Sequence, residues 1–415
     1  MEIGREYYLN QLVSRMGNGK VKVISGIRGC GKSYLLFILF ERYLLQHGVD
    51  NEHIIEMALD GADGSLRGLK RCFSYIKSAV KDDGRYYVLI DEAERLASAA
   101  QVLNDVVRTT NADIYVTADD CGLLTDAAAG LRGRGDEVRL YPLSFFELHS
   151  AYNGDYEEDL KSYMLYGGLP QTVQLQDEQQ KREYLSDMAL NACVKGVVQR
   201  NNLRSAKEAE ALVRVLASSV GELTNPSRIS NAFESGAHVS YTNKTVSKHI
   251  DYLSEAFFIS KAERFDIGSR RYVGAGAKYY FTDIGLRSAV LDFAPPNAAQ
   301  SLENIVYNEL SSRGWGVGTG VLNVWGKSAS GRRARKQMKV DFSADKGSQR
   351  YYIQLACGPL TAESLTSRVA PLCAIRDAFT KIVIIDGDAD PWRTDEGFVV
   401  LGMKRFLTAP DALDF

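Results

Sequence analysis

The segment SGIRGCGKSYLL, residues 25–36, has the residue types and spacing of a phosphate-binding turn. Its glycines fit the pattern G-x-x-x-x-G-K-S, after the apolar run VKVISG and before a leucine-rich helical run. Such a turn lets backbone amides converge on phosphate oxygens at the start of a helix. Lys32 would contact the β- and γ-phosphates of ATP, and Ser33 would bind Mg²⁺. The predicted nucleotide-binding residues are Gly26, Ile27, Arg28, Gly29, Cys30, Gly31, Lys32, Ser33 and Tyr34.

The segment YYVLIDEAE, residues 86–94, places two acids at the end of an apolar strand. Asp91 would hold Mg²⁺ through water, and Glu92 would orient and polarise the attacking water. An Asp-Glu pair alone would more often be a solvated helix start. Its position after the phosphate-binding turn favours the catalytic interpretation, and a carboxylate at Glu92 favours hydrolysis over binding alone.

Two later segments could complete such a site. VTADD places Thr117, Asp119 and Asp120 after a fourth strand, where they would act as a polar sensor of the γ-phosphate or simply form a turn. Arg132 and Arg134 precede a fifth strand. An arginine here could reach the nucleotide of a neighbouring subunit, although most surface arginines have no such role. Cys30 adds one expectation, that alkylation blocks nucleotide binding if its thiol is accessible.

The elements around these residues predict an α/β fold with a parallel sheet. Apolar runs alternate with helical segments, and no proline occurs before Pro142. Near-continuous apolar strands of this kind belong to a parallel sheet covered on both faces. We expect this P-loop ATPase domain to span residues 1–147. Its predicted strands are residues 21–26, 54–60, 86–91, 113–118 and 137–143.

The rest of the chain predicts three further domains. Residues 148–204 read as a helical lid, broken by the turn YGGLP at 166–170. Residues 205–292 read as three helices and a hairpin, which predicts a winged helix-turn-helix. In its third helix, the buried face would be Val246, Ile250 and Leu253. A proline-stiffened linker, FAPPNAAQ, precedes a mixed α/β domain at 297–415.

Composition indicates a multidomain globular protein. The chain has 415 residues, 45% of them hydrophobic and 25% charged, and a net charge of −2. This charge gives no global basic field for nucleic acid. The sequence shows no membrane helix and no secretion signal, so we expect a cytoplasmic protein. The six cysteines and five histidines show no metal-ligand spacing, which predicts reduced thiols and no structural zinc.

The segments GIRGCGKSYLL, YYVLIDEAE, IYVTADD, LRGRGDEVRLYPLSFFEL and YGGLP together resemble a family of prokaryotic AAA-type ATPases. Members carry a helical lid, a winged helix and a C-terminal restriction-endonuclease-like domain of unknown function. The resemblance implies ATP and Mg²⁺ as cofactors, Arg134 as an arginine finger and therefore a homo-oligomer. Where this family commonly reads Gly-Ser-Asn, this chain has Ala118, Asp119 and Asp120, and the added negative charge could slow turnover.

The last domain resembles the PD-(D/E)xK nucleases through SLENIVYNEL, KVDFSA and YYIQLAC. Such chemistry needs two acids to hold Mg²⁺ and a lysine to position or activate water. Glu303 and Asp341 are present, but the E-x-K element reads Gln354-Leu355-Ala356. We therefore expect a structural or partner-binding domain without nuclease activity.

DNA is a candidate partner through local basic residues. Phosphate contacts and a solvated charged face look alike in sequence, and the overall charge favours solubility for the loop from Arg332 to Lys339. The candidates are Lys244, Lys248 and His249 on the third winged-helix segment, Lys261, Arg264, Arg270 and Arg271 on the hairpin, and Arg332, Arg333, Arg335, Lys336 and Lys339 in the loop.

Together these patterns predict a Mg²⁺-dependent ATPase that changes the conformation of its winged-helix and nuclease-like domains. The alternative is a slow-hydrolysing, ATP-controlled switch in signalling or on DNA. Turnover well below about 1 s⁻¹ would favour the switch.

Overall fold

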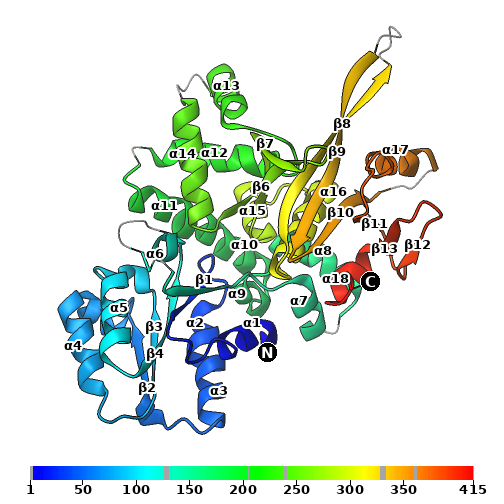
Figure 1. Cartoon of the computed structure of the whole chain (residues 1–415). Coiled ribbons are helices and arrows are strands. Elements are labelled where there is room, and N and C mark those ends of the chain that lie inside the picture. Colours follow the sequence, from blue (N-terminus) through cyan, green and yellow to red (C-terminus); the bar gives the residue numbers. More distant parts are fainter. Residues whose placement is uncertain are drawn as a thin grey trace. The chain divides into compact units, whose positions relative to one another are not determined.

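A computed structural model of the chain (Figure 1) divides it into two compact units. The first unit comprises Met1–Pro142, Leu169–Gln174 and Glu255–Phe258, and the second comprises the remaining residues. The structure describes residues 3–125, 130–131, 133–152, 154–203, 205–237, 241–327, 333–358 and 362–414.

The first unit contains a five-stranded parallel sheet in the order β2-β3-β4-β1-β5. All residues of β1 and β3 are buried, because apolar side chains occupy both faces of these strands. The α/β fold with a parallel sheet is therefore confirmed. The strands are β1 (Val21–Ser25), β2 (Ile54–Ala58), β3 (Tyr86–Asp91), β4 (Ala112–Ala118) and β5 (Gly135–Arg139).

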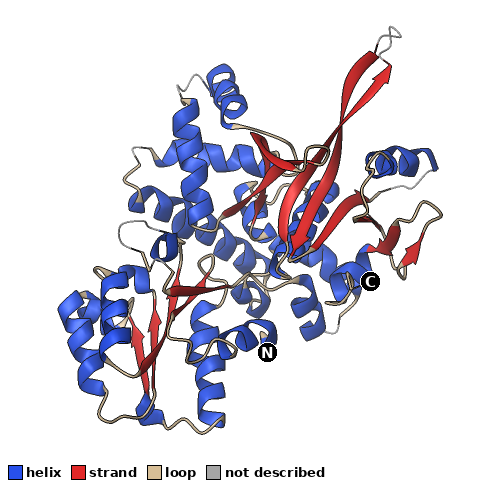
Figure 2. Cartoon of the chain, in the orientation of Figure 1, coloured by secondary structure: helices blue, strands red, loops and turns tan. Residues whose placement is uncertain are grey.

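Helices alternate with these strands along the first unit (Figure 2). Val88 and Val116 of the sheet share one apolar core with Ile76 and Leu103, which lie on α4 and α5. The helices are α1 (Glu6–Val13), α2 (Lys32–Tyr34), α3 (Glu41–Gln46), α4 (Leu69–Ala79), α5 (Ala99–Thr109), α6 (Gly122–Thr125) and α9 (Pro170–Gln174). A π-helical segment, Leu35–Phe40, joins α2 to α3. Short 3-10 turns occur at Asn51–His53, Ala62–Arg67 and Ala93–Arg95.

The second unit begins with helices. Val246, Ile250 and Leu253 of α14 are buried, which confirms the predicted inner face of this helix. A π-helical segment, Asp187–Val194, joins α10 to α11. None of the helices within the described ranges is long and apolar enough to cross a membrane. These helices are α7 (Phe145–Tyr152), α8 (Tyr156–Tyr166), α10 (Glu178–Ser186), α11 (Lys195–Arg200), α12 (Ala206–Ser218), α13 (Pro226–Ala237), α14 (Asn243–Glu255) and α15 (Ile284–Val290).

An eight-stranded sheet in the order β12-β13-β11-β10-β9-β8-β6-β7 runs through the second unit. The hairpin β6-β7 pairs through β6 with β8, so it shares one sheet with the C-terminal strands although the predicted linker lies between them. Pairing with β8 satisfies backbone groups that a free hairpin would leave exposed. The strands are β6 (Ile259–Asp266), β7 (Arg271–Phe281), β8 (Gly316–Lys327), β9 (Arg333–Lys346), β10 (Gln349–Ala356), β11 (Thr380–Ile385), β12 (Trp392–Arg393) and β13 (Val399–Gly402). The remaining helices are α16 (Ala298–Ser312), α17 (Ala362–Cys373) and α18 (Met403–Thr408).

Candidate functional site

The predicted phosphate turn lies between β1 and α2. Gly31 has φ of 101°, a left-handed conformation that disfavours residues with a side chain. A Cβ atom added at Gly26 would lie 2.4 Å from the backbone oxygen of Leu140. The turn therefore needs glycine at both positions, for backbone conformation at one and for close packing at the other. Beyond it, α2, the π-helical segment and α3 follow without a break from Lys32 to Gln46.

Lys32 is buried and its ammonium points back into this turn. Its Nζ lies 2.8 Å from the backbone oxygen of Gly26 and 3.1 Å from that of Ile27. The carboxylate of Asp119 lies 2.6 Å from the same nitrogen. Burial disfavours the charged lysine, but the neighbouring Cys30 and Asp119 together outweigh this, and the pKa of Lys32 is raised. Lys32 is therefore charged, and Asp119 neutralises it.

Ser33, Asp91 and Thr117 form a chain of hydrogen bonds beside the turn. The hydroxyl of Ser33 donates to Asp91 Oδ2 at 2.8 Å, and that of Thr117 donates to Asp91 Oδ1 at 2.5 Å. Hydroxyl and carboxylate oxygens are ligands that Mg²⁺ accepts. The described residues contain no group of three or more His, Cys, Asp or Glu that could hold a metal. These residues fit Mg²⁺ whose other ligands are phosphate oxygens and water.

Glu92 follows directly after β3 and has an unusual backbone. Its φ of 55° and ψ of 51° are left-handed values that are uncommon for residues other than glycine. Its N–H donates to Thr117 Oγ1 at 2.9 Å, which helps to hold this conformation. Its carboxylate accepts a hydrogen bond from the guanidinium of Arg95. The predicted water activator is therefore paired with Arg95.

Glu94 is an acid that the sequence analysis missed. Its Oε2 is buried and has no hydrogen-bond partner in the part of the chain that the structure describes. Burial, and then the charges of Asp119 and Asp120, raise the pKa of Glu94 to about 7. In sequence the run Asp-Glu-Ala-Glu resembles an ordinary helix start. The only available signal was the second glutamate, two residues after Glu92.

The three candidate sensor residues have different environments. Asp119 pairs with Lys32, and Thr117 binds Asp91. Asp120 accepts a hydrogen bond from the N–H of Gly122 at 2.8 Å, as a turn residue would. The structure therefore brings Thr117 and Asp119 to the phosphate turn, while a sensor role for any of the three stays a prediction.

Arg134 lies at the end of the sheet opposite the phosphate turn. It is exposed, and its backbone oxygen accepts a hydrogen bond from Val21, the first residue of β1. The phosphate turn follows the other end of β1, so about 16 Å of strand separates the two backbones. Arg134 thus lies away from its own phosphate turn, and its role as an arginine finger stays a prediction. Arg132 lies outside the described residues.

Cys30 does not meet the condition for ready alkylation. Its thiol is fully buried and donates to the backbone oxygen of Leu140 at 3.6 Å. Burial also raises the pKa of Cys30, so little thiolate forms. We expect iodoacetamide at pH 8 to modify the exposed Cys373 at least about tenfold faster than Cys30, as measured by peptide mass mapping. Equal rates at the two cysteines would contradict the buried position of Cys30.

The acids of the nuclease-like pattern also come together. Gln354 Nε2 donates to Asp341 Oδ2 at 2.6 Å. Lys278, on β7, lies 2.7 Å from Glu303 Oε1 and 3.8 Å from Asp341 Oδ1. Sequence reasoning missed Lys278 because this lysine lies on a strand outside the recognised pattern. Lys278 of β7 thus lies beside these two acids, although Gln354-Leu355-Ala356 itself contains no lysine.

The basic residues proposed for DNA contact are only partly available. His249 is buried and hydrogen-bonds Tyr241, so it belongs neither to a phosphate-contacting surface nor to a solvated charged face. A ring on the inner side of α14 packs in the core, whereas Lys244 and Lys248 of this helix are exposed. Arg332 and the side chains of Arg333 and Arg335 lie outside the described residues, while Lys336 and Lys339 are exposed. On the hairpin, Lys261, Arg270 and Arg271 are exposed and Arg264 is half-buried.

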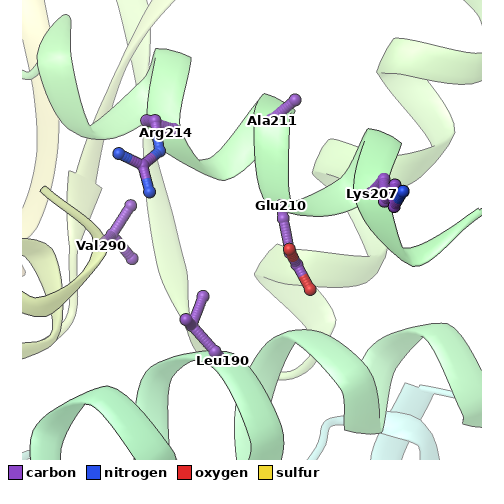
Figure 3. A pocket seen from close by; sticks show the side chains of 6 residues that line it. All are labelled: Leu190, Lys207, Glu210, Ala211, Arg214 and Val290. Atoms are coloured by element: carbon purple, nitrogen blue, oxygen red, sulfur yellow. The ribbon is translucent and has the colours of Figure 1, made fainter. Parts of the chain in front are cut away.

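A separate cavity of about 260 Å³ lies among helices of the second unit (Figure 3). Arg214, one of its lining residues, pairs with Asp292 at 2.7 Å. The cavity contains none of the predicted catalytic residues, so it is not the candidate site. Its lining residues are Leu190, Lys207, Glu210, Ala211, Arg214 and Val290.

Two known families match parts of the chain. The family described as "AAA domain" matches residues 18–149, which include the phosphate turn, Asp91 and Asp119. The family described as "Domain of unknown function (DUF8612)" matches residues 157–297. The phosphate turn thus lies in an AAA-type P-loop domain.

Relatives and solved structures extend the comparison. An uncharacterized protein of Haemophilus influenzae is 32% identical over 390 residues, which cover 92% of this chain and 93% of that protein. An uncharacterized protein of Methanocaldococcus jannaschii is 24% identical over 341 residues, which cover 78% of this chain and 71% of that protein. The crystal structure of Cdc6p from Pyrobaculum aerophilum matches 69% of this chain and 93% of its own at 11% identity, with a TM-score of 0.30.

Proposed function

The chain belongs to the same family as the uncharacterized Haemophilus influenzae protein and contains an AAA domain, and on this basis we propose that it binds and hydrolyses ATP with Mg²⁺. The observation that carries this proposal is the meeting of Lys32, Ser33 and Asp91 at one glycine-rich turn. A lysine, a hydroxyl and a carboxylate at this position are the groups that a P-loop ATPase needs.

Each residue has a role in the proposed reaction. Lys32 exchanges Asp119 for the β- and γ-phosphates of ATP, and Ser33 and Asp91 would hold Mg²⁺, which would neutralise charge on the phosphates. Glu92 leaves Arg95 and accepts a proton from the attacking water. The water oxygen then bonds to the γ-phosphorus, the bond from phosphorus to the ADP oxygen breaks, and the proton passes from Glu92 to solvent or product.

We further propose that Arg134 completes the site of a neighbouring copy. Its distance along β1 from its own phosphate turn supports a role between subunits. A guanidinium at the γ-phosphate would stabilise charge in the transition state. ATP turnover would then change the conformation of the lid at 148–204, the winged helix at 205–292 and the nuclease-like domain at 297–415, each of them a predicted domain.

The second candidate is a slow ATP-controlled switch, in signalling or on DNA. It is favoured by the ion pair between Lys32 and Asp119, which ATP would have to displace from Lys32. In such a switch, ATP binding would replace the pairing of Lys32 with Asp119 by a pairing with the phosphates. Hydrolysis would only return the protein to its first state.

The test is steady-state phosphate release against protein concentration, with and without duplex DNA. We expect specific activity to rise with concentration, and Lys32→Ala and Arg134→Ala each to lose about 10³-fold or more. An equimolar mixture of the two variants should regain activity, because the Lys32→Ala copy supplies Arg134 to a neighbour that binds ATP.

Three results would change this proposal. Full loss in Arg134→Ala without recovery in the mixture would contradict action between subunits. Wild-type turnover well below about 1 s⁻¹ at every concentration, with ATP still bound, would favour the switch. No ATP binding by the wild type would exclude both candidates.

A further inference from the structure

The cavity lined by α12 in the second unit (Figure 3) combines an apolar wall with charged side chains of both signs. The apolar wall consists of Val290, which is buried, and of Leu190 and Ala211, which are half-buried. Glu210 and Arg214 lie about one turn apart on α12, and Glu210 points toward the helical segment that carries Leu190. The volume of about 260 Å³ lies just below the roughly 300–1,000 Å³ of drug-sized pockets, so the cavity suits a small molecule.

The charged residues of this cavity do not neutralise one another. Glu210 and Arg214 are four residues apart, with the acid first, a spacing at which opposite charges on a helix can pair. Arg214 pairs instead with Asp292, at 2.7 Å, and Glu210 joins no ion pair within the described ranges. A half-buried carboxylate without a counter-charge is unfavourable. A ligand with a positively charged group would remove this cost.

Arg214 can exchange its partner at little cost. In the pair of Arg214 with Asp292, 57% of the arginine side chain and 73% of the aspartate side chain are exposed. Ion pairs this exposed contribute about 1 kcal/mol or less. A planar guanidinium can bind a carboxylate through two parallel hydrogen bonds. A ligand carboxylate can therefore replace the carboxylate of Asp292 on Arg214.

The backbone after α15 holds Asp292 in place without help from Arg214. Asp292 and Phe293 have φ of 55° and 53°, left-handed values that are rare for bulky residues. The N–H of Asp292 donates to the backbone oxygen of Ala289 at 3.1 Å, and that of Phe293 donates to Ser288 at 2.8 Å. These two bonds close the turn that ends the helix. Loss of the pair with Arg214 should therefore leave the fold intact.

A solvated charged face explains this arrangement less well. On such a face Glu210 would project into water or pair along its own helix with Arg214. Here Glu210 is half-buried, and it lines a cavity together with three apolar side chains from three different segments. An apolar wall beside a few charged groups is the usual composition of a site for a small ligand.

We propose that this cavity binds an α-amino acid with a small aliphatic side chain. Arg214 binds the carboxylate of the ligand in place of Asp292, Glu210 binds its ammonium, and the apolar wall packs against its side chain. The two charged groups of an α-amino acid are attached to one carbon atom. They therefore match opposite charges on successive turns of one helix, where Cβ atoms lie about 5–6 Å apart. The ligand brings no net charge into the cavity.

The experiment measures binding of L-leucine to the full chain by ligand-observed NMR titration without ATP. Isocaproate is the second probe, because it has the carbon skeleton and carboxylate of leucine without the ammonium. We expect isocaproate to bind about tenfold or more weakly than L-leucine, because Glu210 then has no partner and repels the carboxylate. Glu210→Gln should weaken L-leucine binding by a similar factor and remove most of the difference between the two probes.

Two substitutions at the carboxylate-binding end have opposite expected effects. Arg214→Gln should weaken L-leucine binding about tenfold or more, because it removes the guanidinium. Asp292→Asn should tighten binding about threefold, because it removes the competing carboxylate, and asparagine tolerates a left-handed backbone. Lys207→Gln is the matched control, since Lys207 has the same charge and lines the same cavity from α12. We expect this control to change binding by no more than about twofold.

Tighter binding by Asp292→Asn supports the site through a gain of affinity, so this result does not depend on a variant that folds poorly. The proposal is overturned if Arg214→Gln and Lys207→Gln weaken L-leucine binding equally, or if isocaproate binds as tightly as L-leucine. Absence of L-leucine binding to the wild type up to about 10 mM, a binding free energy of only about 2.7 kcal/mol, also overturns it. Binding is measured without ATP, so the result is independent of the proposed ATP hydrolysis.

Discussion

Glu92→Gln is expected to slow ATP hydrolysis by about 10²- to 10⁴-fold while ATP still binds. The amide keeps the shape of the side chain but cannot accept a proton from water. The backbone of Glu92 should keep its left-handed conformation, because its N–H still donates to Thr117. Single-turnover hydrolysis measured beside equilibrium binding of a fluorescent ATP analogue would separate the two effects.

Glu94→Gln is the matched control for this substitution. Glu94 follows Asp91 by three residues and is the rival candidate for the base, because its pKa of about 7 would suit that role. If Glu92 is the base, Glu94→Gln should keep the rate within about threefold. If Glu94 were the base, its variant would lose the activity instead. In that case the wild-type rate would also rise as the pH increases through 7, because more Glu94 would then be in the carboxylate form.

Asp119→Asn is expected to tighten ATP binding about tenfold, equivalent to roughly 1.4 kcal/mol. Asp119 holds the ammonium of Lys32, which the phosphates must take over when ATP binds. The same carboxylate would also repel those phosphates. Asparagine keeps the size of the side chain and removes both effects. Isothermal titration with a non-hydrolysable ATP analogue measures the change directly.

Asp120→Asn separates this pairing from a general effect of charge. Asp120 is the neighbouring acid, and it bonds the N–H of Gly122 in the turn. We expect its neutralisation to change ATP affinity by no more than about twofold. An equal increase in ATP affinity in both variants would indicate that removal of a negative charge is the whole cause. Weaker binding by Asp119→Asn would mean that Asp119 contacts the nucleotide favourably, as a sensor does.

The sequence by itself determined the local features of this protein. Glycine spacing specified the phosphate turn, because left-handed backbone and close packing at Gly31 and Gly26 allow few other residues. Runs of buried apolar residues predicted the parallel strands, and a helical period predicted the inner face of α14. These signals depend on residues a few positions apart, so they can be read directly.

Only the tertiary structure decided which distant side chains meet. The pairing of Lys32 with Asp119 depends on β1 and β4 being adjacent strands of the sheet. Neither segment of sequence alone shows that these two strands are adjacent. Lys278 reaches Glu303 because β7 lies near α16, and His249 is buried where a sequence pattern shows only another basic residue. Strand order and side-chain packing are long-range properties, because they result from many weak contacts across the whole core.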